Sequence, residues 1–274
     1  LDGYAEQCCP VFEVFHQTYH WSLMQVEYAT DLVFRSAATL QPLYDTLARQ
    51  AILTVKAEQV ARFLGKKITP QLAEELLEMG LDVLTTGNHV WDKKEVLDYI
   101  TKEPRLLRPA NYPAGVPGRG SIVAQTGDGR AVGVINVMGR VFMTPIDDPF
   151  KVVLAEIEKV RKDTAIVFVD FHAEATSEKV AMGWHLDGRA TVVVGTHTHV
   201  QTADERLLLQ GTAYITDVGM TGPHDGVIGV ERHAIVTRFL TGMPQRFETA
   251  KDNPRLNGVI VDADESTGRA LAIR

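Results

Sequence analysis

Cysteine is almost absent from this chain, and so are long apolar runs. The 274 residues include only Cys8 and Cys9, which are adjacent. Without spaced cysteines, the sequence excludes a disulfide framework and a cysteine-rich zinc site. No apolar run reaches the roughly 18 residues that cross a bilayer, and residues 1–23 lack the basic start and apolar centre of a signal peptide. We therefore expect a cytoplasmic protein that does not bind membranes.

Positive charge is also scarce. The chain has 28 Lys and Arg residues against 35 Asp and Glu residues, a net charge of -7. A protein that holds duplex nucleic acid by electrostatics needs an excess of cations to displace counterions. Stable binding of duplex nucleic acid is therefore excluded as the main function, whereas a small or single-stranded nucleotide substrate stays open. The 45% of hydrophobic residues is ample for a packed core.

The alternation of helix and strand patterns predicts one mixed α/β domain over residues 24–274. Residues 1–23 have no clean periodicity, and we expect them to form an extension outside this domain. The pair Thr69 and Pro70 is typical of a helix start, and Gly80 stops the amphipathic helix that follows. The Pro- and Gly-rich segment 108–120 is expected to lie outside the core.

Apolar runs and turn signals predict the strands. Buried strands are expected at residues 81–86, 165–169 and 192–194, and possible strands at 26–30 and 51–56. Segments 121–125 and 131–138 flank the turn TGDGR, a pattern typical of a β-hairpin. Further hairpins are expected within residues 206–215 and in the tail, 257–274. Both parallel and antiparallel pairing are therefore predicted.

Metal-binding residue types follow the predicted buried strands. Asn88 and His89 follow the first, His172 the second, and His197 and His199 the third. In α/β proteins the carboxyl ends of neighbouring strands form the usual site of chemistry. Mixed nitrogen and oxygen ligands suit iron, manganese or zinc better than magnesium or calcium. A single histidine is more often structural, so it is their convergence that indicates a site.

His197 and His199 belong to the stretch VVVGTHTHV and are separated by one residue. In extended chain, residues two apart point to the same side. We therefore expect the two imidazoles to share one metal or to hold a pair of metals.

The N-terminal third offers carboxylates for the same site. Asp31 and Glu58 both follow possible strands. A carboxylate can bridge two cations about 3.5–4 Å apart, which together activate a water and clamp the oxygens of a phosphate. The expected nucleophile is a metal-bound hydroxide, because the metals lower the pKa of the water toward about 7. His89 would then protonate the leaving oxygen.

Four long strings resemble the YmdB-like family of bacterial calcineurin-type metallophosphoesterases: GNHVWD, DFHAEATSEK, GTHTHV and DVGMTGPHDGVIG. RPANYP and NVMGRVFM are also similar, and the resemblance covers about residues 68–229. It implies a four-layer αββα sandwich of two mixed β-sheets flanked by helices. It also implies a homo-oligomeric phosphodiesterase that acts on 2',3'-cyclic nucleotides with two iron or manganese ions per chain.

The resemblance also implies roles for single residues. Asn88, His172 and His197 would hold one metal and His199 the other, with His89 as the proton donor. Asp31 stands at the first ligand position and Glu58 at the bridging position, and Gln59 replaces an Asn ligand. Residues 24–67 diverge, because the glycines of the family pattern, which permit positive φ and close backbone approach, are nearly gone there.

Residues around these ligands are given supporting roles. His224 lies in a Gly-rich loop that we expect to border the substrate pocket. Glu174, Thr176 and Ser177 are expected to orient His172, since metal ligands usually have such partners. Two alternatives stay open at this point. One is a regulatory or nucleotide-binding protein that keeps the fold but has lost catalysis through residues 24–67, and the other is a hydrolase of other bonds, such as amides.

Overall fold

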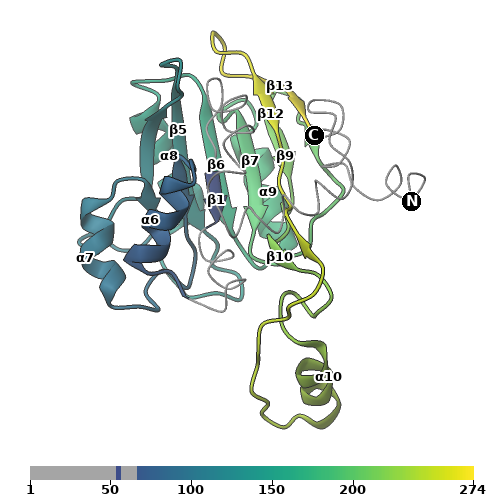
Figure 1. The fold of residues 1–274 in the computed structure, drawn as a ribbon. Coiled ribbons are helices and arrows are strands. Elements are labelled where there is room, and N and C mark those ends of the chain that lie inside the picture. Colours follow the sequence, from purple (N-terminus) through teal and green to yellow (C-terminus); the bar gives the residue numbers. More distant parts are fainter. Residues whose placement is uncertain (1–53, 57–66) are drawn as a thin grey trace, which may run out of the picture.

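The computed structural model describes residues 54–56 and 67–274, shown in colour in Figure 1. The predicted extension at residues 1–23 and the predicted strand at 26–30 lie outside the described residues. So do three predicted metal ligands: Asp31, Glu58 and Gln59.

A six-stranded mixed sheet forms the centre of the fold, in the order β4-β5-β6-β7-β9-β8. Strands β5, β6, β7 and β9 are parallel, and β4 and β8 pair antiparallel at the two edges. The α/β class and the hairpins within residues 121–138 and 206–215 are confirmed. The strands are β4 (Ser121–Gln125), β5 (Ala131–Met138), β6 (Val167–His172), β7 (Val192–Thr196), β8 (Arg206–Leu207) and β9 (Ala213–Ile215).

A second, parallel sheet contains β1 (Thr54–Lys56), β2 (Val83–Thr85) and β3 (Leu106–Leu107). Its β2 and β3 side chains alternate between two cores, as strand geometry requires. Val83 and Leu107 pack with Val134 of the six-stranded sheet. Leu84 and Leu106 face the other way and pack with helices α6 (Pro70–Glu78) and α7 (Glu95–Lys102).

The other face of the six-stranded sheet packs against α8 (Pro149–Val160) and α9 (Thr176–Leu186). Val153 and Ile157 of α8 and Met182 of α9 share a core with the central strands. Figure 1 shows α6 and α7 grouped away from α9. Across the described ranges, 54–56 and 67–274, no helix combines the length and apolar character needed to cross a membrane.

Helix α6 follows directly from local sequence signals. The side chain of Thr69 accepts a hydrogen bond from Leu72 N (3.3 Å), and Pro70 occupies the first turn. Gly80 follows with φ 95°, a backbone conformation that glycine adopts without steric cost. The predicted helix start and stop are therefore confirmed.

The C-terminal part adds an arm and a hairpin. β10 (Gly222–Pro223) and β11 (Pro254–Arg255) pair antiparallel, and the chain between them carries α10 (Arg232–Thr241), which projects from the body in Figure 1. β12 (Val261–Ala263) and β13 (Ala270–Ile273) form the predicted tail hairpin. Residues Val192 and Ile215 of the six-stranded sheet pack with Ala270 of this hairpin.

The expectation that segment 108–120 lies outside the core is wrong for Asn111, which is fully buried. Its amide donates to Met138 O (2.7 Å) and Asp147 O (2.9 Å), and its Oδ1 accepts from Met138 N (2.9 Å). A polar loop residue can be buried when its hydrogen bonds are satisfied in this way. Asn111 thereby ties the loop to the end of β5.

Candidate metal centre

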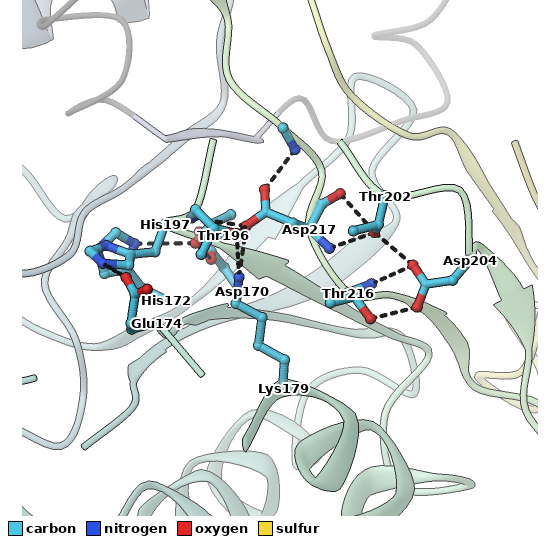
Figure 2. Close-up of polar contacts among 12 residues, drawn as sticks. Asp170, His172, Glu174, Lys179, Thr196, His197, Thr202, Asp204, Thr216 and Asp217 are labelled. Atoms are coloured by element: carbon cyan, nitrogen blue, oxygen red, sulfur yellow. Dashed lines mark hydrogen bonds and ion pairs between the residues drawn. The ribbon is translucent and has the colours of Figure 1, made fainter. Parts of the chain in front are cut away.

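Three of the predicted ligands meet at the carboxyl ends of the strands. His172 is the last residue of β6, His197 follows β7, and Asn88 follows β2 after two residues. His172 Nε2 lies 2.8 Å from Asn88 Oδ1 and 3.1 Å from His197 Nδ1. The rings of His172 and His197 are arranged edge to face, with centroids 4.7 Å apart, and Figure 2 shows both next to Glu174. Two ring nitrogens and one amide oxygen therefore converge.

Gly87 makes this convergence possible. A Cβ atom at this position would lie 2.2 Å from His172 Nε2, closer than any real contact. Any other residue at this position would displace the imidazole from Asn88. Glycine is thus needed at position 87 because the His172 ring lies so close to its Cα, and not because the backbone there has a positive φ.

Asp170 and two threonines orient the His172 ring. Thr85 Oγ1 and Thr196 Oγ1 donate to the two oxygens of the buried Asp170 carboxylate, at 2.6 and 2.8 Å. Because the hydroxyl proton of Thr196 is directed to Asp170, its oxygen is free to accept from His172 Nδ1, 3.2 Å away. The other ring nitrogen, His172 Nε2, faces Asn88 Oδ1. Metal-binding histidines are commonly oriented through their second nitrogen in this way.

Sequence reasoning gave Asp170 no role, although a signal existed. Asp170 precedes His172 by two residues on the same strand, so both side chains lie on one face. The expectation that Glu174, Thr176 and Ser177 orient His172 is not met, since Thr196 is the partner of its Nδ1 atom. Glu174 Oε2 instead lies 2.9 Å from His197 Nε2. Burial lowers the pKa of His197, and the nearby Glu174 carboxylate opposes this shift.

The backbone at His197 and His199 is not extended, so the extended geometry expected from their spacing is wrong, whereas their roles as metal ligands stay a prediction. β7 ends at Thr196, and the two histidines have φ values of 106° and 66°. These values lie in the left-handed region, which few non-glycine residues occupy. The two rings consequently have different neighbours, since His199 Nδ1 donates to Ile228 O (3.2 Å) while His197 contacts His172.

A buried ion pair holds this turn, which we call the His-Thr-His turn (residues 197–199). Asp217 Oδ2 accepts from Thr198 N (3.1 Å), Thr198 Oγ1 (2.7 Å) and Lys179 Nζ (2.7 Å). The side chains of Lys179 and Asp217 are 2% and 0% exposed. Strained backbone persists where its surroundings fix it, and such sites cluster at functional positions. Sequence reasoning missed this pair, because its partners lie on α9 and beyond β9.

Two further predicted residues lie outside the contact of Asn88, His172 and His197. His89 is half exposed, and its Nδ1 lies 3.2 Å from Asp92 Oδ2. Burial would raise the pKa of Asp92, but the Lys67 ammonium (2.8 Å) and His89 hold it below its ordinary value. His224 lies at the base of the arm, where its Nδ1 donates to Gly222 O (2.9 Å) and its Nε2 accepts from Asn257 Nδ2 (3.2 Å).

Comparison with known proteins identifies the family. The family model described as "YmdB-like protein" matches residues 37–274. This chain belongs to the YmdB-like protein family. The resemblance noted in the sequence is confirmed, and it extends to the arm and the tail hairpin.

Two bacterial relatives of this YmdB-like protein have names that describe an activity. It is 52% identical over 209 residues to a 2',3'-cyclic-nucleotide 2'-phosphodiesterase of Bacillus subtilis (strain 168), covering 76% of this chain and 79% of the relative. It is 36% identical over 227 residues to a putative phosphatase/phosphodiesterase of Mycoplasma pneumoniae, with 80% and 79% covered.

Two crystal structures have the same fold. One is a hypothetical protein from Thermus thermophilus, with a TM-score of 0.77, 39% identity, and 89% of this chain and 91% of that chain covered. The other is described as a novel phosphatase from Mycoplasma pneumoniae, with a TM-score of 0.77, 33% identity, and 90% and 87% covered. Both support the mixed α/β architecture.

The converging atoms of this YmdB-like protein fit a metal ion. His172 Nε2, His197 Nδ1 and Asn88 Oδ1 can each offer a lone pair to a cation, and His172 Nε2 lies 2.8 and 3.1 Å from Asn88 Oδ1 and His197 Nδ1. Two imidazoles and an amide oxygen suit iron, manganese or zinc. Within residues 54–56 and 67–274 no three His, Cys, Asp or Glu side chains gather as a metal site, so Asn88 is needed as the third donor.

Proposed function

We propose that this YmdB-like protein is a dinuclear metal-dependent phosphodiesterase that hydrolyses 2',3'-cyclic nucleotides. The observation that carries the proposal is the convergence of Asn88, which follows β2 of the three-stranded sheet, with His172 and His197 of the six-stranded sheet. The relative named 2',3'-cyclic-nucleotide 2'-phosphodiesterase, at 52% identity, supports the substrate class.

The proposed metals are iron or manganese. Asn88, His172 and His197 would hold one ion, and His199 would bind the second. Asp31 and Gln59 are proposed as further ligands and Glu58 as the bridge between the ions. When bound, two such ions supply positive charge that polarises the phosphodiester and makes a water a stronger nucleophile at neutral pH.

His89 is proposed as the general acid. Its Nδ1 faces the Asp92 carboxylate, 3.2 Å away, which orients the ring. A proton on Nε2 is then available for the ribose oxygen when its bond to phosphorus breaks. Half exposure of the ring permits a new proton to be taken from solvent before the next turnover.

The remaining residues of the site would position these groups. Asp170, Thr85 and Thr196 would orient the His172 ring, and Lys179 with Asp217 would fix the His-Thr-His turn. His224, at the base of the arm, is proposed to border the bound substrate. Its two ring nitrogens already have hydrogen-bond partners, so contact through the ring face or edge is expected.

For the fold we propose a four-layer αββα sandwich in a single domain that begins near residue 24, with residues 1–23 as an extension. The core contacts support the layer order α8 and α9, six-stranded sheet, three-stranded sheet, α6 and α7.

We also propose that the protein is a homo-oligomer. Support comes from α10, whose Phe239 and Leu240 are 82% and 81% exposed. A large exposed apolar patch is typical of an interaction surface.

The direct test is hydrolysis of 2',3'-cyclic AMP by the full chain loaded with iron or manganese, with the products separated by chromatography. We expect ring opening to a nucleoside monophosphate that stops when the metal is chelated. A folded, metal-loaded sample that does not open the ring would contradict the proposal. A parallel amide substrate separates the phosphodiesterase from a hydrolase of other bonds.

The role of His89 has its own test. His89→Ala should slow turnover by about 100- to 10,000-fold, the usual range for a general acid, and leave the bound metal unchanged. An aryl phosphodiester whose leaving group needs no proton should lose much less activity. If the variant loses metal, or both substrates slow equally, His89 is not the proton donor.

A further inference from the structure

The turn that follows β5, residues 139–143, carries an aromatic side chain into solvent. Phe142 is 90% exposed, and its neighbour Val141 is 41% exposed. Scattered exposed apolar residues are normal on a protein surface. Phe142 differs from them in its position and in the way its backbone is held.

The turn starts beside the candidate metal ligands. Met138, the last residue of β5, pairs with His172 in the sheet, and Gly139 N donates to His172 O (2.9 Å). Consecutive Cα atoms are about 3.8 Å apart, so Phe142 lies within about 11 Å of Gly139. Phe142 is therefore near the edge at which a bound phosphate would sit.

A buried carboxylate fixes the backbone of the turn. Glu178 of α9 is 8% exposed and accepts from Arg140 N (2.9 Å) and Val141 N (3.3 Å). Gly139 permits this approach, because a Cβ at that position would lie 2.4 Å from Glu178 Oε2. Met143 N closes the turn on Arg140 O (3.3 Å). The backbone is therefore held on both sides of Phe142, by the contacts of Arg140 and Val141 before it and of Met143 after it.

Phe142 adopts a conformation that bulky residues rarely take. Its φ is 61°, in the left-handed region. Residues held in this region by their surroundings cluster at active sites and ligand clamps. A turn that served only to connect β5 with α8 would have no need of an aromatic residue in this conformation, held out into solvent.

We propose that Phe142 is a stacking platform for the nucleobase of the substrate, an inference that rests on the proposed function. With the cyclic phosphate at the histidines, the base extends away from them and needs an apolar surface on which to lie. Aromatic side chains stack on every base, because each base has a π-face. Because the backbone of the turn is held in advance, only the side-chain torsions of Phe142 have to be ordered on binding, which limits the entropy loss.

The test compares a nucleotide with its base-free counterpart. Phe142→Ala should raise the KM for 2',3'-cyclic AMP about tenfold, as expected for loss of one stacked base. The same variant should leave the KM for ribose 2',3'-cyclic phosphate unchanged. Phe142→Tyr and Phe142→Trp, which keep an aromatic face, should retain the wild-type KM for both substrates. Val141→Ala is the matched control on the same turn and should alter neither.

Equal changes for the two substrates, or no change for the nucleotide, would overturn the role of Phe142. If the wild-type protein hydrolyses neither compound, the proposed function is contradicted instead. In that case, calorimetric binding of 2',3'-cyclic AMP to wild type and Phe142→Ala still tests the platform: about tenfold weaker binding supports it, and equal binding contradicts it. Circular dichroism melting of each variant verifies that it is folded.

Discussion

Asp217 and Asp204 are two carboxylates with similar partners and different effects on the chain around them. Both accept hydrogen bonds from threonine hydroxyls, and their networks meet at Thr202, as Figure 2 shows. Asp204 accepts from the hydroxyls of Thr202 and Thr216, and so links the two ends of the segment that contains β8 and β9. Asp217 binds Thr198 and the buried Lys179, and so fixes the His-Thr-His turn.

The two carboxylates differ in which segment of the chain their hydrogen bonds hold. The loop around Asp204 contains none of the proposed ligands. The turn held by Asp217 contains His197 and His199, both at positive φ. We therefore expect disruption of Asp217 to affect metal binding and disruption of Asp204 to affect stability alone.

The largest effect is expected for Asp217→Asn. Loss of this charge leaves Lys179 buried without its counter-charge, which typically costs about 3–5 kcal/mol. The melting temperature of the metal-free protein should then fall by about 10 °C. Manganese affinity, measured by the electron paramagnetic resonance of free Mn²⁺, should also decrease. Unchanged affinity in a folded Asp217→Asn protein would contradict the role assigned to the pair.

A gentler change separates positioning from folding. Thr198→Val keeps the shape of the side chain but removes the hydroxyl that donates to Asp217. We expect about tenfold weaker manganese binding, at the lower end of what loss of a ligand's supporting contact costs. Thr198→Ser keeps the hydroxyl and should restore wild-type affinity. If the Thr198→Val and Thr198→Ser variants bind manganese equally well, the hydrogen bond from Thr198 to Asp217 does not position the histidines.

The smallest effect is expected at Asp204, and it depends on pH. Burial would raise the pKa of Asp204, but hydrogen bonds from Thr202 and Thr216 outweigh it and hold the pKa below its ordinary value. The ionised form therefore stabilises the fold above the unfolded pKa, and this contribution is lost as the pH falls through the lower, folded value. Asp204→Asn should lower the melting temperature at pH 7 by about 2–4 °C, equivalent to about 1 kcal/mol.

Two measurements check Asp204→Asn, which is the matched control for Asp217→Asn: the pH dependence of its melting temperature and its affinity for manganese. Thermal melts from pH 7 to pH 3 should show a difference between wild type and Asp204→Asn that shrinks at the acid end. Manganese affinity should be unchanged. Weaker metal binding in Asp204→Asn would remove the distinction between the two carboxylates.

Features set by neighbouring residues were predictable from the sequence. Thr69, Pro70 and Gly80 mark the ends of α6 because capping is local. Asn88, His172 and His197 were expected together at strand ends, and the structure brings them together. His172 and His197 follow neighbouring parallel strands, but Asn88 follows β2 of the second sheet, and the packing of the two sheets was not predictable. That Asn88, His172 and His197 bind a metal stays a prediction, as do the proposed ligand roles of Asp31, Glu58 and Gln59.

Features set by distant contacts were not predictable. The backbone of His197 and His199 depends on Asp217, which is 19 residues from Thr198, and on Lys179 of α9. The burial of Asn111 depends on its contact with Met138, 27 residues away. Helix α10 was not predicted for a different, local reason, because Ile235, Val236 and Thr237 are weak helix formers in succession.

The central claim is that Asn88, His172 and His197 hold a metal ion, and manganese titration of His172→Ala tests it most directly. His185→Ala is the matched control, because His185 contacts Phe150 O (3.0 Å) and none of the proposed ligands. We predict that His172→Ala loses at least one manganese ion per chain relative to wild type, whereas His185→Ala retains the wild-type stoichiometry. Equal manganese binding by folded wild type and His172→Ala would contradict the account.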